Sequence, residues 1–137
     1  MSKAGRTPRL FKRLAALTFA TGALIDTGRV LVGREQWVRE YFTPPVDIAF
    51  GILVLSAAIP GLLSWHRYSG GRAGRIVCGF AMLMLLVSVP LHLRTIKTWS
   101  TDYLIVFPVW YSLIEIPLFV FLSLAMTRLQ FDRRKFK

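Results

Sequence analysis

The stretch that decides the fold is Val46–Trp65, which reads VDIAFGILVLSAAIPGLLSW. About 20 apolar residues are needed to cross the hydrocarbon core of a bilayer, and this stretch carries its one acidic residue, Asp47, at its start. Three similar runs occupy Leu14–Val32, Ile76–Leu93 and Tyr103–Thr127. A helix that is apolar on all sides belongs inside a large protein or in a membrane. Because 137 residues cannot enclose four such helices, the sequence predicts an integral membrane protein.

The segments between these runs are short, at about residues 33–45, 66–75 and 94–102. Short connections make consecutive helices antiparallel neighbours. We therefore expect an all-α single domain over residues 1–137, a membrane four-helix bundle with up-down-up-down topology. The first connection alternates charged and aromatic residues over Arg34–Phe42, and we expect a short helix there, lying in the membrane interface.

The formal net charge is +11, and most of the 18 Lys and Arg residues lie in the two tails and the second connection. These residues are Lys3, Arg6, Arg9, Lys12, Arg13, Arg67, Arg72, Arg75, Arg128, Arg133, Arg134, Lys135 and Lys137. The positive-inside rule then predicts that both termini are cytoplasmic. The same distribution favours contact with anionic membrane lipids and argues against nucleic-acid binding.

Three charged residues lie inside the apolar runs: Asp26, Arg29 and Glu115. A charge at the bilayer centre costs roughly 2.5–3.5 kcal/mol, so such residues pair or face a cavity. Asp26 and Arg29 are three residues apart and can pair along one helix face. Asp26 and Glu115 each lie 12 residues, or about 18 Å, from one end of their runs, which predicts similar depths in the membrane.

Other polar residues occur near the outer ends of the runs. Asp47, His92 and Tyr111 are expected to join the three charges around one polar site in the outer half of the bundle. Two interpretations stay open: a ligand-binding or proton-handling pocket, and a structural ion cluster that joins helices. Asp47 follows Pro44-Pro45 and is interpreted as a residue that caps the start of a helix.

The sequence lacks the common catalytic and metal-binding patterns. It contains no Ser-His-Asp set, His-x3-His pair or Walker loop, and its single cysteine, Cys78, excludes an internal disulfide. We therefore predict no catalytic residue, metal or cofactor, and expect a protein that is not an enzyme. His92 alone has the chemistry to ligate haem or a pigment, but a hydrated interfacial histidine is the expected role.

Two stretches, Leu17–Ile25 (LTFATGALI) and Phe50–Leu55 (FGILVL), together with the chain length, resemble the DoxX-like family of small four-span bacterial membrane proteins. This resemblance implies an accessory subunit of a membrane redox system in the bacterial inner (plasma) membrane. A second stretch, Trp110–Phe119 (WYSLIEIPLF), is similar to the sigma-2 receptor and emopamil-binding group. That resemblance implies acidic residues that hold a cationic or sterol-like ligand.

Three functional hypotheses follow. The first is an accessory or structural subunit that associates with other membrane subunits or with copies of itself. The second is a binder or isomerase of a small lipophilic ligand, using Asp26 and Glu115. The third is a small transporter, for which four spans suffice only in an oligomer.

Overall fold

The computed structural model describes residues 3–65 and 71–129, which form six helices and no strand. Four helices are long: α1 (Lys3–Val32), α3 (Pro44–Ser64), α4 (Gly71–Thr98) and α6 (Val109–Arg128). Two are short: α2 (Arg34–Glu40) and α5 (Tyr103–Val106). All four long helices have the length and apolar character needed to cross a membrane. The prediction of an all-helical, multi-pass membrane protein is therefore confirmed.

The helix ends differ from the predicted runs. α1 and α4 extend well beyond Leu14–Val32 and Ile76–Leu93, because backbone hydrogen bonding continues where hydropathy falls. The largest difference is in the last run, where Tyr103 belongs to α5 and the spanning helix begins only at Val109. Phe107 has extended backbone angles, as expected for a residue that precedes proline. Pro108 then serves as the N-cap of α6.

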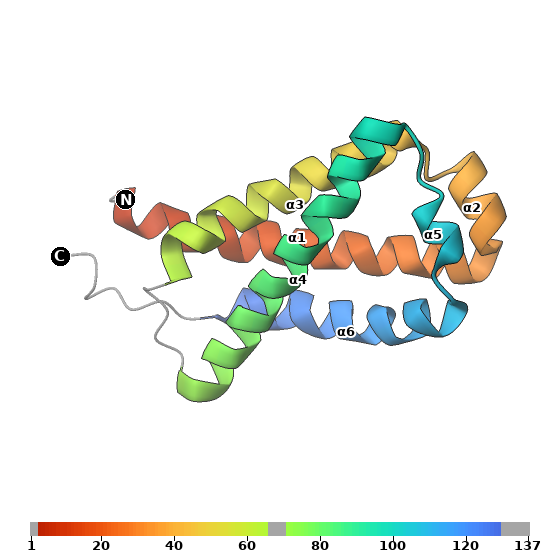
Figure 1. The fold of residues 1–137 in the computed structure, drawn as a ribbon. Coiled ribbons are helices and arrows are strands. Elements are labelled where there is room, and N and C mark those ends of the chain that lie inside the picture. The colour runs from red at the N-terminus through yellow and green to blue at the C-terminus, as the bar shows by residue number, and fades with distance from the viewer. Residues whose placement is uncertain (1–2, 66–70, 130–137) are drawn as a thin grey trace.

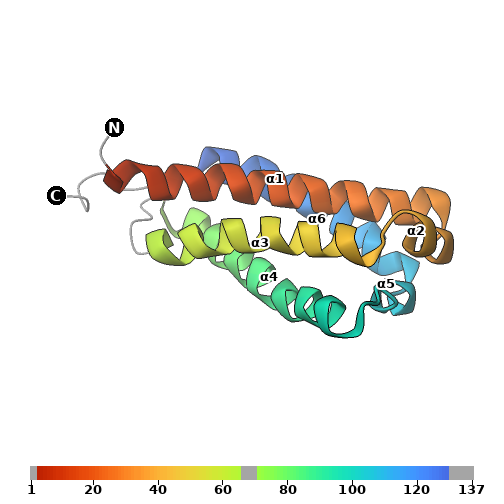
Figure 2. The same cartoon turned by 90° about the horizontal axis from the view of Figure 1, so that it is seen from above.

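The long helices pack around α1. Figures 1 and 2 show α1 beside both α3 and α6, whereas α4 crosses the others obliquely and packs mainly against α3. The start of α1 and the end of α6 lie at the same end of the molecule. The two short helices, α2 and α5, lie next to each other at the opposite end.

The core lies between α1, α3, α4 and α6 and contains small residues at the helix contacts. It includes Phe11, Ala15, Phe19, Val54, Ala57, Ala58, Cys78, Ala81, Met82, Leu85, Leu122 and Met126. Small residues let helix backbones approach closely in membranes. Many large apolar side chains, such as Leu24, Ile52 and Leu83, are instead exposed around the outside. An apolar outer surface is what lipid contact requires.

The end formed by α2 and α5 is held by polar contacts. The Thr101 hydroxyl donates to the Phe42 carbonyl at 2.8 Å, and Arg34 donates to the carbonyls of Ile105 and Phe107 at 3.3 and 2.7 Å. The short helix expected over Arg34–Phe42 is present as α2, although its place in a membrane interface stays a prediction. These contacts connect the α2 and α5 segments across one end of the bundle.

Several predicted basic residues lie outside the described residues. They are Arg67, Arg133, Arg134, Lys135 and Lys137. The side chains of Lys3 and Arg6 are likewise outside the description.

Candidate functional site

The first polar cluster joins α1 to α6. Arg29 and Asp26 form an ion pair at 3.6 Å, and Ser112 bridges the same two side chains. Arg29 Nη1 donates to Ser112 Oγ at 2.6 Å, and Ser112 Oγ donates to Asp26 Oδ1 at 3.1 Å. Arg29 is only 2% exposed and Asp26 only 4%. The pairing expected from the three-residue spacing is therefore present, and the hydroxyl of α6 completes it.

Arg29 also holds the segment between α5 and α6. Its Nη2 donates to the carbonyls of Leu104 and Phe107 at 2.7 and 3.0 Å. These carbonyls lie where α5 ends, and carbonyls at a helix end lack partners within the helix. The Arg29 guanidinium thus neutralises the Asp26 carboxylate of α1 and donates to the Ser112 hydroxyl of α6. It also satisfies two backbone carbonyls at the end of α5.

Glu115 and Tyr111 extend this cluster along α6. The Glu115 side chain interacts with both Asp26 and Tyr111, and Arg29 is close enough to act on its charge. The similar depth expected for Asp26 and Glu115 thus becomes direct proximity. Asp26 and Glu115 therefore form a pair of neighbouring carboxyl groups beside a single cation, Arg29. Arg29 can balance the negative charge of only one of them.

The second polar cluster centres on Asp47. Its Oδ1 lies 2.9 Å from His92 Nδ1 and accepts a hydrogen bond from the Tyr103 hydroxyl at 2.9 Å. Its Oδ2 accepts a hydrogen bond from the Thr95 hydroxyl. Asp47 is completely buried, and these contacts join α3, α4 and α5.

The interpretation of Asp47 as a helix cap is wrong. Thr43 is the N-cap residue of α3, no side chain forms a capping hydrogen bond there, and Pro44 and Pro45 have no N–H to offer. With fewer backbone donors nearby, the Asp47 carboxylate is satisfied by side chains of α4 and α5. It still lies in the first turn of α3, where the helix dipole favours a negative charge.

Tyr103 lies outside the spanning helices. Burial raises its pKa, and the neighbouring Asp47 carboxylate raises the pKa further, through its charge and its hydrogen bond. The phenol therefore stays protonated and remains a hydrogen-bond donor to Asp47.

Sequence reasoning did not identify Thr95 or Tyr103 as site residues. Thr95 follows His92 by three residues, a spacing that places both on one face of α4. That spacing was the available signal for Thr95. Tyr103 gave no such signal, because its position depends on the break between α5 and α6.

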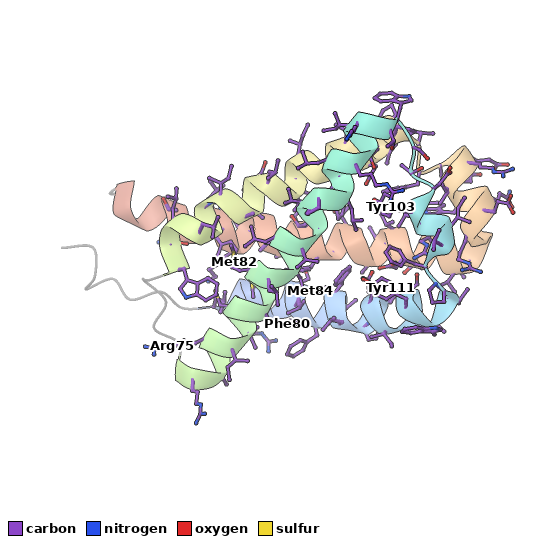
Figure 3. All side chains as sticks on the ribbon, viewed as in Figure 1. Arg75, Phe80, Met82, Met84, Tyr103 and Tyr111 are labelled. Atoms are coloured by element: carbon purple, nitrogen blue, oxygen red, sulfur yellow. The ribbon has the colours of Figure 1, made fainter. Side chains whose placement is uncertain are left out.

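One cavity of about 140 Å³ connects the two clusters, and it is partly open. All six residues predicted for a polar site line it: Asp26, Arg29, Asp47, His92, Tyr111 and Glu115. The rest of its wall is mostly apolar, with the aromatic side chains Phe42, Phe50, Phe107 and Phe119 and the aliphatic residues of α4. Figure 3 labels three lining residues, Met84 from α4, Tyr103 from α5 and Tyr111 from α6.

Two lining residues have a buried nitrogen with no hydrogen-bond partner in the structure. They are Arg29, through Nε, and His92, through Nε2. Buried polar atoms usually have partners, so an unpaired one calls for an explanation. Within residues 3–65 and 71–129, no three His, Cys, Asp or Glu residues are grouped to hold a metal ion. His92 is not the hydrated interfacial histidine that was expected, because its side chain is buried and bonded to Asp47. Ligation of haem or a pigment by His92 stays an untested alternative.

No protein-family model, curated protein or solved structure that was compared matches this chain. The resemblances to the DoxX-like family and to the sigma-2 receptor group therefore stay predictions. The site must be interpreted from its own geometry.

Proposed function

We propose that this protein binds a small, largely apolar molecule that carries a polar group, in the cavity between the four long helices. The observation that supports the proposal is the combination of a 140 Å³ cavity, mostly apolar walls and polar side chains from α1, α3, α4, α5 and α6 that meet there. Ligand sites are typically apolar hollows with a few placed polar groups. This proposal favours the ligand-binding hypothesis over a purely structural subunit.

The desolvation free energy lost by burying these charged side chains supports the same proposal. The Asp26–Arg29–Ser112 contacts join α1 to α6. The contacts of the completely buried Asp47 join α3, α4 and α5 and add further desolvation on the wall of the same cavity. Two such clusters on one cavity are better explained by a molecule that both of them contact.

We place this cavity in the outer half of an up-down-up-down bundle whose termini are cytoplasmic. Support comes from the basic residues at the end of the molecule that holds the start of α1 and the end of α6, such as Arg13 and Arg128. The cavity lies toward the other end, where Phe42 and the α5 residues Tyr103 and Leu104 line it. The bacterial inner membrane is the compartment that the DoxX-like resemblance implies.

The experiment uses toluene as an apolar probe and the methionine methyl groups as reporters in lipid nanodiscs. Met84 lines the cavity, whereas Met82 and Met126 are buried in the core away from it. We expect toluene to shift the Met84 methyl resonance in a saturable manner and to leave those of Met82 and Met126 in place.

A cavity-filling variant provides the control for lipid effects. Ser88 lines the cavity, and Ser88→Phe should abolish the Met84 response by occupying the space. Leu86→Phe changes an exposed residue of the same helix that does not line the cavity, and it should leave the response intact. A response that is absent in the unmodified protein, or equal in both variants, would refute ligand binding at this site.

Association with other membrane subunits is a second candidate, favoured by the surface of α6. Its residues Trp110, Ile114, Phe121 and Leu124 are all largely exposed. Lipid or a partner helix would cover this face. Crosslinking from a photoreactive residue at Ile114 in intact membranes should capture a protein partner if the subunit hypothesis holds and only lipid if it does not.

A further inference from the structure

The atoms free to meet a ligand are few, because most polar groups of the site already have partners. Asp47 accepts three hydrogen bonds, from His92, Thr95 and Tyr103. Asp26, Glu115 and Arg29 interact with one another and with Ser112 and Tyr111. His92 Nε2, on a residue only 8% exposed, has no partner, and neither does Arg29 Nε. Both residues line the cavity, and these two nitrogens are the unpaired ones that a ligand group could satisfy. A guanidinium nitrogen can only donate, so only His92 Nε2 could accept a hydrogen bond from a ligand.

The neighbours of His92 determine which role this nitrogen plays. The Asp47 carboxylate is an acceptor, so the proton of the neutral imidazole is assigned to Nδ1, which donates to Asp47. Nε2 is then a hydrogen-bond acceptor. An acceptor of this kind needs a ligand that brings a donor, such as a hydroxyl group.

The imidazole is also held in place on its apolar sides. A Cβ at Gly51 would lie only 2.8 Å from His92 Cβ, so this glycine lets α3 and α4 approach closely at this level. The Phe50 ring contacts the imidazole edge-on, with ring centroids 5.5 Å apart. The direction of the Nε2 lone pair is thus set by packing as well as by Asp47.

The size and composition of the cavity define the apolar part of the ligand. An apolar cavity of about 150 Å³ accommodates benzene, so 140 Å³ is suited to one six-membered ring. Aromatic side chains such as Phe50, Phe107 and Phe119 line the space, and aromatic rings pack well against each other. A carboxylate ligand is disfavoured, because Asp26, Asp47 and Glu115 already outnumber Arg29.

We infer that the ligand of this cavity is a neutral monocyclic phenol, whose hydroxyl donates a hydrogen bond to His92 Nε2. This inference rests on the proposed ligand-binding function and names the chemical class that the function serves. The aromatic walls take the ring, and the Asp47–His92 pair selects the hydroxyl.

The test compares phenol with toluene, which have the same number of heavy atoms, in nanodiscs that contain the unmodified protein. Two readouts are recorded: the Met84 methyl shift for occupancy and the His92 Nε2 shift in protein labelled with ¹⁵N-histidine. The chain has two histidines, so a His66→Gln variant assigns the signals. We expect both ligands to shift Met84 and phenol alone to shift the His92 Nε2 resonance.

The variant His92→Phe supplies an independent measurement, with the exposed Leu93→Phe as its control. The ratio of phenol affinity to toluene affinity should fall at least tenfold in His92→Phe and stay unchanged in Leu93→Phe. If phenol shifts Met84 but leaves His92 Nε2 unchanged, or if benzylammonium binds more tightly than phenol, the inference is overturned while ligand binding stands. If no ligand shifts Met84, both the inference and the proposed function fail.

Discussion

Arg29 is the residue on which the most contacts of the site depend. It is buried, pairs with Asp26 and bonds Ser112 and the carbonyls of Leu104 and Phe107. We expect Arg29→Met to reduce the free energy of unfolding by about 3–5 kcal/mol, because it leaves a buried carboxylate without its cation. Unfolding by SDS titration in mixed micelles measures this change.

Arg39 offers a matched control for Arg29. It pairs with Glu35 on α2 at 2.7 Å, but both side chains are largely exposed. Arg39→Met should therefore change stability by no more than about 1 kcal/mol. Equal losses from the two substitutions would contradict the assigned role of Arg29.

The raised pKa of Tyr103 predicts that the stability of the folded protein falls at alkaline pH. Burial and then the Asp47 carboxylate hold its pKa above the ordinary value of 10, so the folded protein retains a proton that the unfolded chain loses. Stability is then unaffected by this group below pH 10 and falls as the pH rises above 10, by at most about 1.4 kcal/mol per pH unit. Unfolding measured between pH 8 and pH 11 in the unmodified protein and in Tyr103→Phe should show this difference. Identical pH profiles would contradict it.

At this scale the sequence predicted positions along helices better than contacts between them. The Asp26–Arg29 pair follows from helical spacing, and that spacing holds in any helix. The Asp47 contacts do not follow, because they need α4 and α5 to approach the start of α3 at the same level. Two prolines that remove nearby N–H donors were the available hint that Asp47 would not cap its helix.

The contact between α3 and α4 sets the geometry of the second cluster. Gly51 lies against the backbone-proximal atoms of His92, which cannot move away as the end of a flexible side chain can. We expect Gly51→Ala to separate the two helices and to destabilise the protein by about 1–3 kcal/mol. The same substitution should weaken toluene binding as reported by Met84.

Gly79→Ala is the matched control on α4. Its Cβ would meet only the Trp65 ring, at 3.2 Å, and the substitution also improves helix propensity. It should leave stability unchanged or raise it. A Gly79→Ala variant less stable than Gly51→Ala would contradict the assigned role of the α3–α4 contact.

The elements themselves were predicted well where hydropathy decides them. Four apolar runs became four long helices, because only a helix satisfies its own backbone in lipid. Hydropathy could not reveal the break at Phe107-Pro108, since both sides of it are apolar. The path of α4 was equally hidden, because it depends on contacts between helices such as that of Gly51 with His92.

At the scale of the whole molecule, the charge distribution predicts orientation in the membrane. In a Cys78→Ser background, we expect Gln36→Cys on α2 to react with a membrane-impermeant maleimide added outside intact cells. Arg72→Cys at the start of α4 should react only after the membrane is opened. Labelling of the two positions in the reverse order would place the cavity on the cytoplasmic side.

The most informative measurement on the cavity requires no assumed ligand. Native mass spectrometry of the protein purified in mild detergent reports any small molecule that copurifies with it. We predict a bound molecule of aromatic composition on the unmodified protein and on Leu86→Phe, and its loss from Ser88→Phe. A molecule retained by Ser88→Phe, or an unmodified protein that carries none when isolated from its own membranes, would contradict the proposal that this cavity is a ligand site.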